Sequence, residues 1–120
     1  MNKQKFRKQL LKQWRERCKE QAGFKCEYCG RTGKGLCCHH IQPYATRNSP
    51  LKYMVQNSIL LCARCHKYST ECSAHRTPLQ FYHWFEKEHL NRYNWILLHY
   101  LDKTDLDDEA VLRGLSDALL

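Results

Sequence analysis

Two pairs of closely spaced cysteines constrain this chain more than any other feature. Cys26 and Cys29 stand in "CEYC", Cys62 and Cys65 stand in "CARC", and 32 residues separate the pairs. A C-x-x-C turn supplies two thiolates to one tetrahedral zinc ion, so two such turns complete a four-cysteine site. Such a site has no open coordination position, and we expect its zinc to hold the fold without doing chemistry. The alternatives are unrelated buried cysteines or redox dithiols, and the lack of a βαβ pattern disfavours the latter.

The length and composition suit one small domain over residues 1–120. The chain has 120 residues, of which 42% are hydrophobic, so a metal staple would compensate for a modest core. No apolar run approaches the ~20 residues of a membrane span, and the first residues lack a stretch of signal-peptide type. We therefore expect a soluble, cytoplasmic protein with no membrane partner, whose eight cysteines are thiols or thiolates rather than disulfides.

Charge is distributed unevenly along the chain. The formal net charge is +8, made up of +7 in residues 1–25, +5 in residues 26–101 and −4 in residues 102–120. A basic body with an acidic tail favours a polyanionic partner, most often nucleic acid. A basic surface kept for solubility is the alternative that charge alone leaves open.

The spacing of apolar residues predicts a helix over residues 3–22, ended by Gly23. Its apolar face comprises Phe6, Leu10, Trp14 and Cys18. Its opposite face is basic and comprises Lys5, Lys8, Lys12, Arg15 and Lys19. That basic face either lies along a phosphate backbone or is simply solvated, and the sequence leaves both readings open.

Short apolar runs predict two strands, over residues 36–42 and 57–62, with a helix beginning near Arg64. Thr77 and Pro78 predict the start of another helix, with Thr77 as its cap. The aromatic segment that follows should pack on the core. The remaining predicted helices cover roughly residues 92–102 and a segment after Thr104 that has Asp105, Asp107, Asp108 and Glu109 in its first turns.

Three further motifs resemble one family. "HHIQP" begins at His39, Asn57 follows His40 by seventeen positions, and His66 directly follows the last cysteine in "LLCARCH". Together with the paired cysteines, this combination over residues 24–67 resembles the His-Asn-His (HNH) endonucleases of the ββα-metal fold. The later stretch "CSAHRTPLQFYHWFE" is similar to the segment after the last knuckle in phage HNH and NinG/Rap-type recombination proteins.

The resemblance implies an α+β fold and a division of labour between neighbouring residues. A zinc-stapled ββα-metal module over residues 24–76 would carry an added basic helix at its N-terminus and a helical extension over residues 77–120. His39 matches a ligand of the catalytic divalent metal, Mg²⁺ or Mn²⁺, and His66 matches the closing ligand. His40 matches the general base, and Asn57 matches the residue that either pins the hairpin or approaches the metal.

Four cysteines and one histidine outside these motifs leave alternatives open. Packing is the reading we favour for Cys37 and Cys38, since a buried cysteine behaves as a small hydrophobic side chain, and Cys18 gets the same reading. Two roles are open for Cys72 and His75. Either the two residues form a third pair of metal ligands, or His75 alone is a further ligand of the catalytic metal. The nine positions between His66 and His75 depart from the family pattern and leave this role open.

The predicted activity is hydrolysis of DNA phosphodiester bonds by a metal-dependent endonuclease of phage type, acting in recombination or DNA processing, either alone or as a homodimer. The residues expected to contact DNA phosphates are Arg31, Lys34, Arg47, Arg64, Lys67 and Arg76. One alternative is a non-catalytic, zinc-stabilised nucleic-acid-binding module, in which His40 would be dispensable. Another is an interaction protein that uses its aromatic residues 81–100 and shows no salt-dependent DNA binding.

Overall fold

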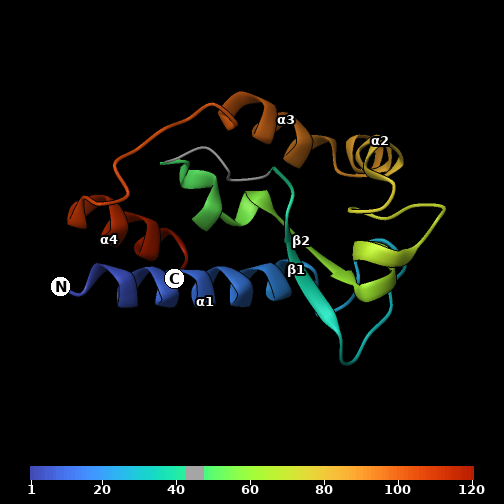
Figure 1. Ribbon diagram of the computed structural model, residues 1–120, viewed down its shortest axis with the longest axis horizontal. Helices are drawn as coiled ribbons and strands as arrows, with labels where there is room; N and C mark the ends of the chain where they lie inside the picture. Colours follow the sequence, from blue (N-terminus) through green and yellow to red (C-terminus); the bar gives the residue numbers. More distant parts are fainter. Residues whose placement is uncertain (43–47) are drawn as a thin grey trace.

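The computed structural model describes residues 1–42 and 48–120 (Figure 1). Its helices are α1 (Lys3–Gln21), α2 (Pro78–Glu88), α3 (Leu90–His99) and α4 (Glu109–Ala118). Its strands are β1 (Leu36–His40) and β2 (Ser58–Cys62). Three short helical turns complete the list: η1 (Pro50–Tyr53), η2 (Val55–Asn57) and the π-helical turn η3 (Arg64–Tyr68). The α+β fold class predicted from the sequence is therefore confirmed.

The two strands form an antiparallel hairpin. His39 pairs with Ile59 and His40 pairs with Ser58, while Leu36 at the start of β1 pairs with Cys62 at the end of β2. Every residue of β2 is buried, whereas β1 is half-buried along its length. An apolar strand that is covered on both faces explains the continuous run "SILLC". The hairpin thus carries both His39 and His40 on β1 and Cys62 on β2.

Two hydrophobic cores lie around the hairpin. The first lies beside the cysteines of the two C-x-x-C pairs, which we call the knuckle cysteines. It connects them to α2 and α3 through side chains such as Ile59, Phe81 and Phe85. The second joins α1 to η1 and α4, and its buried members are Leu10, Trp14, Tyr53, Leu112 and Leu119. Figure 1 shows α1 along one edge with α4 beside its N-terminal half, and α3 on the opposite side of the hairpin. The predicted apolar face of α1 is therefore the face that packs.

Helix ends follow local chemistry, with two differences from the sequence prediction. Gly23 follows α1 with a φ of 66°, as expected for a helix stop. Thr77 stands at the N-cap of α2, but its hydroxyl bonds to the backbone of Ser73 and does not cap the helix. Asp108 is the cap of α4, because its carboxylate accepts from Ala110 N at 2.8 Å. Asp105 and Asp107 therefore precede this helix and are not within its first turn.

Within the described ranges, none of the helices combines the length and apolarity needed to cross a membrane.

Candidate functional site

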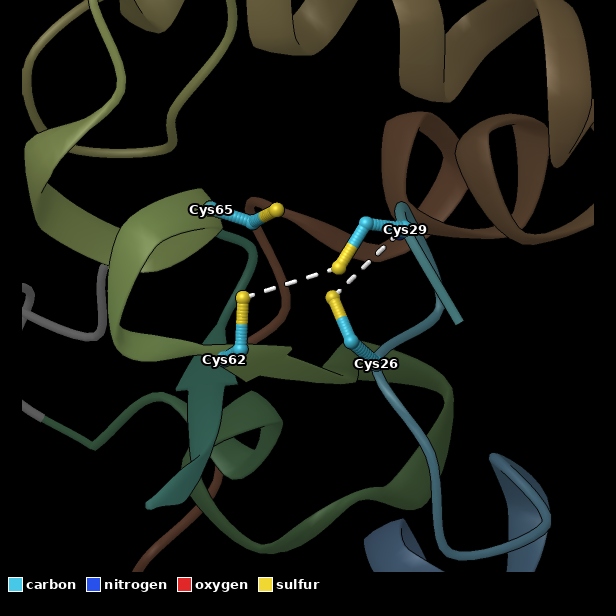
Figure 2. Close-up of side chains that lie close together, drawn as sticks. All are labelled: Cys26, Cys29, Cys62 and Cys65. Atoms are coloured by element: carbon cyan, nitrogen blue, oxygen red, sulfur yellow. Dashed lines mark hydrogen bonds between the residues drawn. The ribbon is translucent and has the colours of Figure 1, made fainter. Parts of the chain in front are cut away.

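The four knuckle cysteines converge on one point. Cys26 and Cys29 come from the loop after α1, Cys62 ends β2, and Cys65 lies in η3. Their sulfur atoms all lie within 4.8 Å of one another, and Figure 2 shows them directed toward a common centre. The Cys29 and Cys62 sulfurs are 3.7 Å apart. Sulfurs bound to one tetrahedral zinc at about 2.3 Å stand about 3.8 Å apart, so the spacing fits this ion.

Burial also favours a cation at this group of sulfurs. Three of the four cysteines are buried and only Cys29 is exposed. Burial raises the pKa of the Cys65 thiol, so a thiolate there needs a compensating positive charge. Zinc supplies that charge and accepts four sulfur ligands. The four cysteines could thus hold a structural zinc ion, as the sequence predicts.

Glu27, between the first two cysteines, ties this knuckle to the rest of the fold. Its backbone N–H donates to Leu60 O, and its carboxylate accepts from Leu60 N, both at 2.9 Å. The carboxylate also pairs with Arg92 of α3 at 2.7 Å, with both side chains largely buried. Sequence reasoning missed both Glu27 and Arg92. The sequence did offer one signal, the acidic residue Glu27 inside a C-x-x-C turn. A carboxylate that is buried needs a cationic partner, and this chain is rich in cations.

A second group comprises three histidines. His39 Nδ1 lies 3.2 Å from His66 Nε2, and His75 Nε2 lies 2.9 Å from the same His66 atom. The nine-residue gap closes because Ala74 N donates to Cys65 O and His75 N donates to His66 O, which folds the loop back along η3. His75 therefore lies beside His39 and His66, although its spacing from His66 departs from the family pattern.

The chemistry of the three histidines suits a divalent metal. Burial and the neighbouring imidazoles lower the pKa of His39 to about 3 and that of His66 to about 4, so both rings are neutral at pH 7. Neutral imidazole is the ligating form. Adjacent nitrogens bound to one ion at about 2.1 Å stand about 3.0–3.4 Å apart, which matches the observed contacts. His75 is exposed, so the group opens to solvent.

The ring nitrogens on the outer side of this group lack partners in the described part of the chain. These atoms are His39 Nε2 and His66 Nδ1, and both are buried. Ligating histidines usually donate that nitrogen's proton to a carbonyl or carboxylate. Nothing within residues 1–42 and 48–120 therefore fixes which nitrogen of either ring carries the proton.

His40 has surroundings quite different from those of His39. Its ring stacks on the indole of Trp14, with centroids 3.9 Å apart and planes 5° from parallel. Its Nε2 lies 2.9 Å from Lys52 O. A carbonyl only accepts, so Nε2 carries the proton and Nδ1 carries the lone pair. Burial lowers the pKa of His40 and so favours the neutral form of the ring. The expected separation of the two neighbouring histidines is thus present.

Asn57 is fully buried and bonds to backbone on both sides of the hairpin's connecting segment. Its Oδ1 accepts from Gln42 N at 2.7 Å, and its Nδ2 donates to Gln42 O at 3.0 Å and to Leu51 O at 3.2 Å. These bonds join the end of β1 to η1. Two roles were left open for Asn57, and these hydrogen bonds favour the one in which it holds the hairpin in place.

The predicted phosphate contacts do not gather on one face. Lys67 and Arg76 directly follow His66 and His75 and are exposed. Arg31 and Arg64 line a pocket of about 380 Å³ beside the knuckle cysteines. Lys34 lines a different depression, together with Lys19 of α1. Arg47 lies outside the described residues.

The other four cysteines belong to neither ligand group. Cys18 and Cys72 are buried, and Cys38 packs at the edge of the core around α1. Cys37 is half-buried, with its sulfur 3.7 Å from Gly35 O. Among the described residues, the two groups of three or more potential ligands are the four cysteines and the three histidines. The burial of Cys18 and the core contact of Cys38 are consistent with packing, whereas a packing role for Cys37, which is in neither hydrophobic core, stays a prediction.

The module is an α+β unit that consists of an antiparallel hairpin, a following helical turn, a four-cysteine group that could hold zinc and an open group of three histidines. This arrangement is consistent with the ββα-metal class. Residues 26–71 match the family model described as HNH endonuclease, so this segment is similar to the HNH endonuclease domain. The curated proteins contain no match to the chain, and neither do the solved structures. The resemblance to NinG/Rap-type proteins stays a prediction.

Proposed function

We propose that this protein is a metal-dependent DNA endonuclease that hydrolyses phosphodiester bonds with His40 as the general base. The observation that carries the proposal is the contrast between two consecutive residues of β1. His39 joins a group of imidazoles suited to a metal, while His40 is held apart with its tautomer set by Lys52 O. A general base beside an open metal position is the minimum that hydrolysis of a phosphodiester needs.

His40 performs the proton transfer in this proposal. Its Nδ1 lone pair takes a proton from the attacking water, while its Nε2–H stays on Lys52 O and keeps the ring oriented. The lowered pKa of His40, caused by burial, keeps the base unprotonated and ready at neutral pH. Asn57 holds the connecting segment that carries this carbonyl, through its bond to Leu51 O. When bound, a divalent ion supplies charge neutralisation at the phosphate and at the leaving oxygen.

His39, His66 and His75 would hold that ion. Three imidazoles are borderline ligands, whereas Mg²⁺ prefers an all-oxygen octahedron. Of the two ions predicted from the sequence, this ligand set therefore favours Mn²⁺ over Mg²⁺. The four-cysteine group would keep Zn²⁺, because thiolates are the softer ligands.

DNA is the proposed substrate because the exposed face of α1 is strongly basic. Its exposed cations are Lys3, Lys5, Lys8, Lys12, Arg15 and Lys19. Arg15 also lies close enough to act electrostatically on His40, so this face reaches the proposed base. Phosphate contacts of this kind position a duplex without reading its sequence. A phage origin, a recombination role, a cytoplasmic location and a homodimer stay predictions.

The test is cleavage of supercoiled plasmid and branched DNA by the full chain, with Mn²⁺ or Mg²⁺. His40→Ala should lose at least about a hundredfold in rate, since a positioned general base contributes about that much or more. It should keep its zinc content and its affinity for DNA. His83→Ala is the matched control, because His83 is an exposed histidine on α2.

The outcomes separate the proposal from its rival. Cleavage that is unchanged in His40→Ala would rule out the proposed base. Wild-type protein that binds these DNAs without cutting them, under either ion, would favour a zinc-stabilised binding module instead.

A further inference from the structure

We infer that Trp14 is a positioning residue for His40, so that α1 supplies part of the catalytic apparatus of the module that follows it. This inference rests on the proposed function. Trp14 lies outside the segment matched to the HNH family, which begins at Cys26. The role therefore belongs to the N-terminal addition of this chain.

The stack between the two rings is the first observation. The planes of Trp14 and His40 are 5° from parallel, and their centroids are 3.9 Å apart. Rotation of a histidine ring about its χ2 bond is only weakly restricted by its own chemistry. The hydrogen bond to Lys52 O fixes the direction of one N–H bond of the ring. The flat indole face sets the plane in which the ring lies.

A second contact joins both rings to one short segment. Trp14 Nε1 donates to Met54 O at 3.0 Å, and His40 Nε2 donates to Lys52 O at 2.9 Å. These two carbonyls flank Tyr53 at the end of η1. A displacement of Trp14 therefore disturbs both the plane of the base and the carbonyl that sets its tautomer.

The indole is itself held firmly. Trp14 is 1% exposed and packs with Tyr53 and Leu112 in the core around α1. The helix is tied to the C-terminal segment by the ion pair of Arg7 with Asp107, and by a hydrogen bond of Ser116 to Gln13. A rigid platform of this kind is what preorganises a catalytic side chain.

Packing and positioning make different predictions for two substitutions. Trp14→Leu keeps apolar bulk but removes the flat face, whereas Trp14→Phe keeps an aromatic face and loses the indole N–H. Trp14→Met is the replacement if Trp14→Leu does not fold, since methionine fills irregular space. Leu10→Ala is the control, because Leu10 is fully buried on the same stripe of α1 and belongs to the same core.

The first readout is independent of activity and uses the zinc-loaded full chain. The ring protons of His40, assigned by their loss in His40→Ala, should resonate upfield in the wild type because they lie over the indole face. Trp14→Leu should move them downfield, Trp14→Phe should retain most of the upfield shift, and the His83 signals should stay in place. Unchanged His40 signals in Trp14→Leu would overturn the inference.

The second readout is kinetic, at a temperature where every variant is folded. Trp14→Leu should lower kcat by about ten- to a hundredfold with KM nearly unchanged, since small misplacements of reacting groups reach that size. Trp14→Phe should recover most of the loss, and Leu10→Ala should keep kcat. An equal loss of kcat in Leu10→Ala would reduce Trp14 to a packing residue. Wild-type protein without any cleavage would refute the proposed function, and the spectra alone would then decide whether Trp14 holds His40.

Discussion

Asn57→Asp is a nearly isosteric change at a fully buried position, and it should destabilise the fold strongly. The introduced carboxyl keeps an acceptor for Gln42 N but loses the amide donor that serves Gln42 O and Leu51 O. Gln42 O is left without this donor, at a cost of about 1–3 kcal/mol, whereas Leu51 O keeps its bond from Met54 N at 3.3 Å, so the lost bond there costs only about 0.5–1.5 kcal/mol. The two losses together predict a fall of about 2–4 kcal/mol in the free energy of unfolding.

The loss should depend on pH. Burial and two facing carbonyls raise the pKa of the introduced carboxyl in the folded state above its unfolded value of about 3.9. A group whose folded pKa is raised is better tolerated when protonated, so the penalty should be smallest at low pH and grow as pH rises through the folded pKa. The difference between Asn57→Asp and wild type should accordingly be larger at pH 8 than at pH 5.

Urea unfolding followed by circular dichroism, with zinc present throughout, measures both effects. Asn94→Asp is the control, because Asn94 is exposed on α3 and a surface change of this kind stays within about 0.5 kcal/mol. A value for Asn57→Asp within about 1 kcal/mol of wild type would refute the reasoning from the two lost amide bonds. A penalty that shrinks as pH rises would refute the assigned direction of the pKa.

The other predictions concern the metals, the knuckle and the DNA. Cys26→Ala should lose both zinc and fold, seen by elemental analysis and circular dichroism, because structural zinc contributes folding free energy directly. His66→Ala should keep its zinc and its fold but lose Mn²⁺ binding, measured by titration; unfolding instead would make His66 a structural ligand. Glu27→Gln should cost about 3 kcal/mol in urea unfolding by breaking a largely buried ion pair, and an unchanged midpoint would contradict this. Lys12→Ala should reduce the salt dependence of DNA affinity by about one phosphate contact, and an identical slope would remove α1 from the interface.

The strongest sequence signals concerned residues whose spacing is dictated by local geometry. The C-x-x-C turns and the apolar run of β2 gave the cysteine group and the hairpin, because a metal-binding turn and a buried strand each need a characteristic local pattern. The separation of His39 from His40 also followed from the alternation of side chains along a strand.

Contacts that depend on long-range packing could not be predicted. Trp14 reads as an ordinary core residue of a helix, and nothing in its neighbours indicates a stack on His40, 26 positions away. The approach of His75 to His66 depends on backbone bonds of the loop after η3, which have no sequence signature. Thr77 shows the same limit at short range, since its hydroxyl could satisfy either the helix end or Ser73.

The register of the hairpin determines which histidine performs which task. His39 faces Ile59 and His40 faces Ser58 in the present pairing. A slip of one residue would send each side chain of β1 to the opposite face, placing His39 against Trp14 and His40 among the imidazoles. β2 ends at Cys62, and its partner cysteines come from both the loop before β1 and the turn after β2. An ion bound there would hold the two strands to a single alignment, so a centre remote from the reaction would select the residue that accepts the proton.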